Sequence, residues 1–239
     1  MIFKASSASL AGVAHQQLEI PCQDSVCVCR ENGILCAALS DGAGSRSMSH
    51  FGARQITQAV SQQICAQFHS LCAAEPAEAA QEILNHCLHA LAQLPYPIDS
   101  LAGTLLFFAA DGHGRFLSGH LGDGIMIAVE ENTARLFSAP ENGEDPCVTW
   151  LVTSPAAPEH FRITTGRLPD HGEMLLMSDG TAAGLYHYPT ATPARACVTI
   201  SKWLREEAED VISAAIAENM QTLFSKKSSD DLSMIVISW

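Results

Sequence analysis

The chain has 239 residues, of which 47% are hydrophobic, and this is enough for one sizeable domain with a well-filled core. Thirteen Lys and Arg residues against 26 Asp and Glu residues give a formal net charge of −13, which argues against binding to nucleic acid. No apolar run approaches the ~20 residues that cross a bilayer, and the first residues lack the apolar region of a signal peptide, so we expect a cytoplasmic protein without membrane contact.

Two apolar runs of strand length stand near the start of the chain, SVCVC at 25–29 and ILCAALS at 34–40. The second run passes directly into Asp41 and Gly42. Taken alone, this pair is typical of a tight turn, because Gly accepts positive φ and Asp bonds to its own backbone. Most of the nine cysteines lie in apolar surroundings, their number is odd and no Cys-x-x-Cys pair occurs, which favours buried thiols over disulfides.

Two helical segments follow, at 50–71 and 76–94. In the first, apolar residues recur at near-four spacing and predict one buried face: Phe51, Ile56, Val60, Ile64 and Phe68. The second repeats the pattern with Ile83, Cys87 and Leu91. We interpret His86 and His89 on this segment as surface residues and not as metal ligands.

From residue 104 onward, short apolar runs are joined by turns that contain Gly and Asp, which is typical of an antiparallel meander. These runs lie at 104–110, 115–121, 124–129, 147–152 and 173–178. Asp111 and Gly112 are interpreted as one of the hairpin turns. A helix at about 199–223 then precedes the last run, at 232–238, and is expected to bury Leu204, Ala208, Val211, Ala215 and Ile216.

This order of elements predicts an α+β fold, an antiparallel β-sandwich flanked by α-helices, in a single domain at 1–239. Carboxylates recur at the ends of its predicted strands: Asp41, Asp123, Asp179, Asp230 and Asp231. Clustered carboxylates repel one another unless cations neutralise them. The candidate ligands are oxygen atoms, and no His or Cys residues have the spacing of a zinc site, so the sequence favours Mg²⁺ or Mn²⁺. Two such ions can activate water and bind a phosphoryl group. Spacing alone does not decide whether these carboxylates meet.

Six elements in this order resemble the metal-dependent type 2C protein serine/threonine phosphatases, over nearly the whole chain. They are PCQDSVCV (21–28), ALSDGAGS (38–45), AGTLLFF (102–108), HLGDGIM (120–126), LLMSDG (175–180) and SSDDLSMIVI (228–237). The combination of PCQD and DGAGS is most similar to a bacterial subgroup of this family.

The resemblance implies a metal site in a cleft at one end of the sandwich. Asp41 would bridge two metal ions, and the carbonyl group of Gly42 would bind one of them. Asp179 and Asp230 would complete the site, and Asp123 would share a weaker third ion with Asp179. The implied cofactors are therefore two or three Mn²⁺ or Mg²⁺ ions.

Other implied roles concern the segment before the first strand. Asp24 would orient water at the metals. Gln23 stands where the family usually carries Glu, and the Arg that many members place shortly before this element to hold phosphate is missing. His15 is the candidate to replace that Arg as a phosphate contact, with a surface or packing role as the alternative. Arg46 is the next choice, because a guanidinium grips phosphate with two parallel bonds.

The implied activity is hydrolysis of phosphoserine and phosphothreonine in a phosphorylated protein partner, by attack of a metal-bridging water, and we expect a monomer. The absence of a Cys-x5-Arg signature agrees, since no protein nucleophile is needed. Two alternatives remain open. One is a pseudophosphatase that binds a phosphoprotein or another partner without turnover, favoured by Gln23 and the missing Arg but opposed by the retained carboxylates. The other is a hydrolase of small phosphate esters, because metal chemistry does not identify the leaving group.

Overall fold

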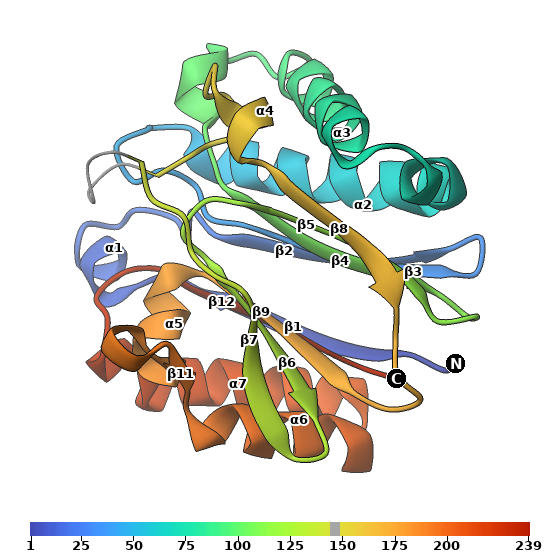
Figure 1. The fold of residues 1–239 in the computed structure, drawn as a ribbon. Helices are drawn as coiled ribbons and strands as arrows, with labels where there is room; N and C mark the ends of the chain where they lie inside the picture. The colour runs from blue at the N-terminus through green and yellow to red at the C-terminus, as the bar shows by residue number, and fades with distance from the viewer. Residues whose placement is uncertain (144–148) are drawn as a thin grey trace.

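Two five-stranded antiparallel sheets face each other, and a pair of helices covers the outer side of each (Figure 1). The computed structural model of the protein describes residues 1–143 and 149–239. The predicted fold class, an antiparallel β-sandwich flanked by α-helices, is confirmed.

The first sheet has the strand order β2-β3-β4-β5-β8. Its strands are β2 (Ser25–Glu31), β3 (Ile34–Ser40), β4 (Leu105–Asp111), β5 (Arg115–Leu121) and β8 (Arg162–Arg167). Two helices cover its outer face, α2 (Ser49–Ala73) and α3 (Pro76–Leu91). The 3₁₀ turn η1 (Ile98–Leu101) and the short helix α4 (Ala157–His160) lie at the same side of the molecule.

The second sheet has the strand order β1-β12-β9-β6-β7. Its strands are β1 (Lys4–Leu10), β12 (Leu232–Ser238), β9 (Glu173–Met177), β6 (Ile125–Glu130) and β7 (Thr133–Ser138). The helices α6 (Arg195–Glu206) and α7 (Glu209–Thr222) pack on its outer face. The remaining elements are short: α1 (Val13–Gln17), α5 (Asp179–Leu185), β10 (Tyr186–His187), η2 (Tyr188–Thr190), β11 (Thr192–Pro193) and η3 (Phe224–Lys226).

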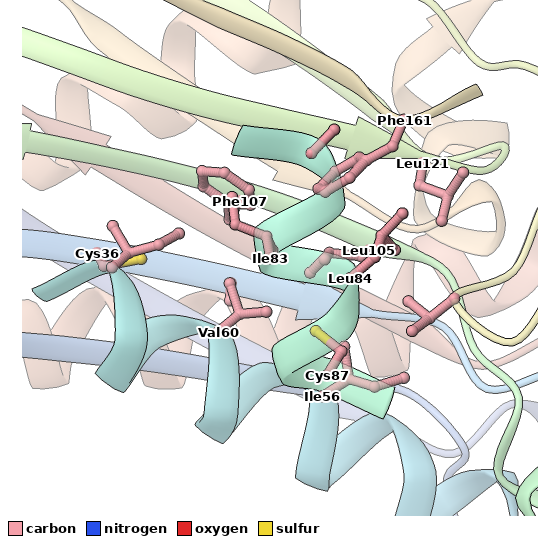
Figure 2. Packing of buried hydrophobic residues seen from close by; sticks show 14 of the residues in the cluster. Cys36, Ile56, Val60, Ile83, Leu84, Cys87, Leu105, Phe107, Leu121 and Phe161 are labelled. Atoms are coloured by element: carbon pink, nitrogen blue, oxygen red, sulfur yellow. The ribbon is translucent and has the colours of Figure 1, made fainter. Parts of the chain in front are cut away.

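The central strands are buried on both faces, which explains their continuous apolar sequences. In β3, Leu35 and Leu39 point to the second sheet, whereas Cys36 and Ala38 point to the layer under α2 and α3. Figure 2 shows this outer layer, where Phe107 of β4 packs near Ile83 of α3. The alternation therefore fixes the register of the sheet, since a shift by one residue would exchange the two faces.

The predicted strands inside the described residues are confirmed, but five further strands were not predicted: β1, β7, β8 and the two-residue strands β10 and β11. Of these, β1, β7 and β8 are edge strands of the two five-stranded sheets. An edge strand in a polar environment carries few apolar residues, as RITTGR at 162–167 shows, so its hydrophobic pattern is weak. The strand predicted at 147–152 lies partly outside the described residues, and of its remainder only Thr149 forms an isolated bridge, to Asn142.

The first two predicted helices are confirmed, with one correction to a buried face. Phe51 is 39% exposed, unlike the other predicted face residues of α2. It lies in the first turn and stacks on the ring of Tyr96, at 5.2 Å between ring centroids, instead of entering the core. His86 and His89 of α3 are exposed, as predicted.

The single helix predicted at 199–223 is wrong, because the chain forms two helices, α6 and α7, with a break at Glu207 and Ala208. The side-chain amine of Lys4 donates to the carbonyl groups of residues 204, 205 and 207, and so satisfies the end of α6. The break also changes which residues of the second helix face the core. Ala208 is exposed and Val211 is 51% exposed, and the buried residues of α7 are Ile212, Ile216 and Met220.

Eight cysteines lie in the described residues and are free thiols, while Cys147 lies outside them. Within the described ranges, no helix is both long enough and apolar enough to cross a membrane.

Candidate active site

An acidic cavity of about 500 Å³ lies at one end of the sandwich. Asp41, Asp123, Asp179 and Asp230 all line it, together with Arg46. The topology explains this convergence: β3, β5 and β9 end at this edge, and β6 and β12 begin there. Four carboxylates that are far apart in the sequence are thus brought into one cavity, which we call the acidic cavity.

The backbone of Asp41 is clamped by Thr104. The Asp41 N–H donates to the Thr104 hydroxyl oxygen at 2.9 Å, and the Thr104 N–H donates to the Asp41 carbonyl oxygen at 2.8 Å. Gly42 also donates its N–H to the Gln23 carbonyl oxygen, at 3.1 Å. A Cβ on Gly42 would lie 2.7 Å from that same oxygen, so a larger residue does not fit. Among the described residues, no N–H donates to the Gly42 carbonyl oxygen, which is left available to a ligand.

Asp179 and Asp230 are placed side by side through the pairing of β9 and β12. The Ser178 N–H donates to the Ser233 carbonyl oxygen, and the Ser233 N–H donates to the Ser178 hydroxyl oxygen, both at 3.1 Å. Gly180 permits the close approach of the two segments, because a Cβ there would lie 2.1 Å from the carbonyl oxygen of residue 231. The first turn of α5 therefore faces the loop that leads into β12.

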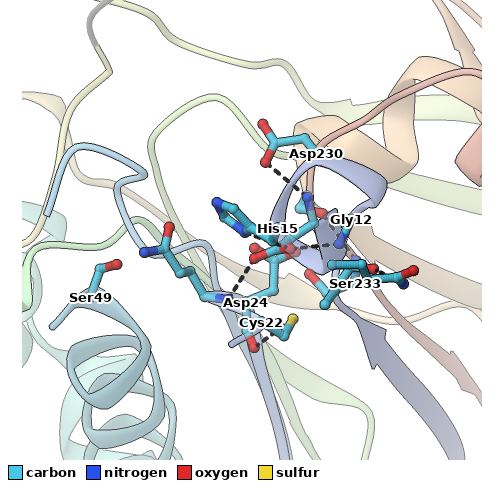
Figure 3. Close-up of polar contacts among 12 residues, drawn as sticks. Gly12, His15, Cys22, Asp24, Ser49, Asp230 and Ser233 are labelled. Carbon is cyan, nitrogen blue, oxygen red and sulfur yellow. Dashed lines mark hydrogen bonds and ion pairs between the residues drawn. The ribbon is translucent and has the colours of Figure 1, made fainter. Parts of the chain in front are cut away.

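Asp231 connects three segments behind the acidic cavity, a role that sequence reasoning missed. It is only 3% exposed. Its carboxylate accepts hydrogen bonds from the Gly12 N–H at 2.7 Å, from His15 Nδ1 at 2.9 Å and from the Gln23 N–H at 2.5 Å. Figure 3 shows this group of contacts, with His15 and Asp24 near its centre. Asp231 thereby holds the segment before β2 against the start of β12.

The structure places the two candidate phosphate contacts differently. His15 is held by Asp231, its side chain is 16% exposed, and it is not among the residues that line the acidic cavity. Arg46 does line it, and it is the only cationic side chain that does so within the described residues. The Arg46 carbonyl oxygen accepts from Gln23 Nε2 at 3.4 Å and from the Ser49 hydroxyl at 2.9 Å. The loop that carries Arg46 is therefore anchored while its guanidinium stays unpaired within those residues.

Burial is the main cause of raised carboxyl pKa values throughout the acidic cavity. It raises the pKa of Asp41 well above its usual range, with Asp24 and then Asp179 adding repulsion. Burial followed by repulsion from Asp230 raises the pKa of Asp179. For Asp123, burial and Asp179 raise the pKa to about 6. These carboxylates disfavour one another's charge, and a bound cation would compensate them.

Asp24 lies at the edge of this group and is 6% exposed. Neither of its carboxylate oxygens has a hydrogen-bond partner within the described residues. Burial raises its pKa to about 7, although the nearby hydroxyls of Ser233 and Ser178 act in the opposite direction. A buried carboxylate without partners is costly unless water or a cation satisfies it.

The donor set of the acidic cavity fits a hard divalent cation. All candidate ligands are oxygens, namely carboxylates and the Gly42 carbonyl, which Mg²⁺ and Mn²⁺ prefer. In the part of the chain that the structure describes, no three His, Cys, Asp or Glu side chains already converge closely enough to hold a metal ion. Ions in this cavity would therefore also use carbonyl and water oxygens, as Mg²⁺ commonly does.

Comparison with known families identifies the family to which this helix-flanked antiparallel sandwich belongs. The family model for protein phosphatase 2C matches residues 11–221, and the chain therefore belongs to the protein phosphatase 2C family. The predicted resemblance is confirmed. No curated protein matches the sequence.

Solved structures share this fold at low sequence identity. A serine/threonine phosphatase of S. agalactiae has a TM-score of 0.70 and 13% identity, with 99% of both chains covered. RsbX, solved in complex with magnesium, has a TM-score of 0.60 and 13% identity, covering 99% of this chain and 94% of that chain. PppA, a key regulatory component of T6SS in Pseudomonas aeruginosa, has a TM-score of 0.66 and 13% identity, covering 100% and 99%. These similarities establish the fold alone.

Proposed function

We propose that the protein is an active metal-dependent phosphatase that hydrolyses phosphoserine and phosphothreonine in proteins. The observation that carries this proposal is the convergence of Asp41, Asp123, Asp179 and Asp230 in one cavity beside Arg46. Membership in the protein phosphatase 2C family supports it. The RsbX structure contains magnesium, which agrees with a hard-cation site in a similar fold.

The acidic cavity offers ligands for two Mn²⁺ or Mg²⁺ ions. Asp41 and the Gly42 carbonyl would bind them together with Asp179 and Asp230, and Asp123 would share a weaker third ion with Asp179. When bound, such ions supply Lewis acidity, which activates a water nucleophile and offsets negative charge on the phosphoryl group. They would also offset the mutual repulsion that adds to burial in raising the pKa values of these carboxylates.

Arg46 is better placed than His15 to bind the phosphoryl group. Its guanidinium, which has no ion-pair partner among the described residues, lines the acidic cavity and can donate two parallel N–H groups to phosphoryl oxygens. His15 instead supports Asp231, and so keeps the segment around Asp24 in position. Asp24 does not line the acidic cavity, but its buried carboxylate lies close enough to Asp41 to raise the pKa of that residue, and it would orient the attacking water through a hydrogen bond.

Gln23 was one of the two departures from the family pattern that favoured the pseudophosphatase alternative. Gln23 is buried, and its side chain donates to the Arg46 carbonyl oxygen while its backbone bonds to Gly42 and Asp231. The replacement of Glu by Gln therefore has a structural use in this chain. It leaves the four cavity carboxylates in place.

Phosphate release from a phosphoserine peptide at saturating Mn²⁺ tests the proposal, with Asp179→Asn and, as a matched control, exposed Asp99→Asn. We expect turnover by the wild type and by Asp99→Asn, and its loss in Asp179→Asn. Peptide binding by the metal-saturated wild type without any turnover would contradict the proposal and favour a pseudophosphatase. Hydrolysis of p-nitrophenyl phosphate but of no phosphopeptide would favour a hydrolase of small esters.

A further inference from the structure

A second cavity, of about 280 Å³, lies at the other end of β5 from the acidic cavity. Its lining includes His69, Cys72, Arg115, Phe116, Thr165 and Arg167, and no carboxylate. Arg115 begins β5, whereas Asp123 follows the end of that strand. At about 3.3 Å per residue, the two cavities are roughly 25 Å apart. We call this second site the arginine cavity.

Two arginines face each other across the strands that form the arginine cavity. Arg115 and Arg167 are direct partners in the antiparallel pairing of β5 and β8. Residues in such positions project from the same face, and like charges there destabilise the pair. Asp111 compensates Arg115, with 2.9 Å between its Oδ2 and Arg115 Nε. Arg167 makes no ion pair with any described residue, so its charge remains uncompensated in a protein of net charge −13.

His69 adds a hydrogen-bond donor to the same site. Its Nδ1 lies 2.9 Å from Nη2 of Arg115. A guanidinium only donates hydrogen bonds, so Nδ1 of His69 must be the acceptor and the ring proton lies on Nε2. The imidazole in this contact is therefore neutral and presents an N–H group at Nε2.

The other polar groups of the arginine cavity carry no negative charge. Burial raises the pKa of the Cys72 thiol to about 11, although Arg115 acts to lower it, and the thiol stays protonated at neutral pH. Thr165 is exposed, and its hydroxyl can donate a hydrogen bond. The cavity thus gathers guanidinium, imidazole and hydroxyl donors, with Asp111 beside it already engaged by Arg115.

We propose that the arginine cavity binds a tetrahedral oxyanion, a phosphate group that is either free or carried by a phosphoserine. The guanidinium of Arg167 would bind two of its oxygens, and Arg115, His69 and Thr165 would donate to the others. An anion here would also relieve the repulsion between Arg115 and Arg167. This site is separate from the acidic cavity and does not depend on catalysis there.

Titration of the full-length, chelated protein with inorganic phosphate tests this site. Without divalent metal, the carboxylates of the acidic cavity repel phosphate. Backbone amide resonances would be followed by NMR, with chloride at equal ionic strength as the reference. We expect saturable shifts at Thr165 and Gly166. Arg167→Gln should weaken the affinity by about tenfold, whereas Arg195→Gln, which removes an exposed charge at the start of α6, should leave it unchanged.

Absence of saturable shifts at Thr165 and Gly166, or equal weakening in both variants, would overturn the proposal. Arg167 would then serve only as a charge that protects the edge strand β8 from pairing with other chains. A phosphoserine peptide titrated in the same way distinguishes the two sources of the ligand. Tighter binding than phosphate supports docking of a phosphorylated protein, and equal binding supports a site for the free ion.

Discussion

Replacing Asp123 with asparagine should stabilise the protein when divalent metal has been removed. Burial, followed by repulsion from Asp179, raises the pKa of Asp123 from 3.8 to about 6. This shift of about two units corresponds to at most about 3 kcal/mol, at 1.36 kcal/mol per unit. Part of the side chain reaches solvent, and screening reduces the expected gain to about 1–2 kcal/mol. For a chain of this size, that corresponds to a rise in Tm of about 2–8 °C.

The sign of the effect depends on pH. The pKa of Asp123 is raised in the folded protein, so its ionised form disfavours the fold. The penalty is absent below the unfolded value of 3.8, grows as the pH rises toward 6 and is complete above it. Asp123→Asn should therefore raise the Tm at pH 8 and change it little at pH 4. With saturating Mn²⁺ the variant should keep the tight metal sites but lose turnover.

Thermal unfolding in excess chelator at pH 4 and pH 8 measures this difference, with Asp99→Asn as the control. Asp99 is exposed in η1, and its substitution removes the same charge outside the acidic cavity. A lower Tm of metal-free Asp123→Asn at pH 8 would refute the reasoning. So would an equal rise in Asp99→Asn, because general charge reduction would then explain the gain.

Three further substitutions test individual contacts. Asp41→Asn should lower turnover by about a thousandfold or more, because it weakens metal binding. Asp111→Asn should leave turnover unchanged but lower stability by about 1–3 kcal/mol, because the buried Asp111 carboxylate accepts three hydrogen bonds in its hairpin turn. Equal losses of turnover in the two variants would contradict the site assignment. Arg46→Ala should raise KM or lower kcat at unchanged Mn²⁺ affinity, whereas Arg54→Ala, an exposed change on α2, should match the wild type in steady-state kinetics. Thr104→Val should lower both stability and turnover, because it leaves the Asp41 N–H without its acceptor, whereas Thr104→Ser should keep both near the wild-type values. A valine variant that is active and stable would show that this hydrogen bond does not position Asp41.

The sandwich could be predicted because its central strands are buried on two faces and carry continuous apolar runs, as at 34–40 and 232–238. Three of the four edge strands of these sheets could not, since strands such as β1 (KASSASL) and β8 (RITTGR) have largely polar sequences. The break between α6 and α7 depends on Lys4, about 200 residues away, which no local pattern reveals. The hairpin turn at Asp111 and Gly112 could be predicted as well, but the burial of the Asp111 side chain could not, because turn residues are not always exposed.

The carboxylates of the acidic cavity could be predicted because each follows or precedes an apolar strand. Their supporting contacts could not. His15 and Asp231 are separated by 216 positions and meet only because β1 pairs with β12. Because of this pairing, the His15 side chain lies against Asp231 and does not line the acidic cavity, although His15 is close to Asp24 in the sequence.

Phosphate release from a phosphoserine peptide, measured before and after chelation of the same protein sample, tests the central claim most directly. All candidate ligands in the acidic cavity are oxygens, and Arg46 is the only cationic group among its described lining residues. We therefore predict no turnover in the chelated protein, full recovery with Mn²⁺ or Mg²⁺, and poor recovery with Zn²⁺. Hydrolysis at the full rate by the chelated, metal-free protein would contradict the account.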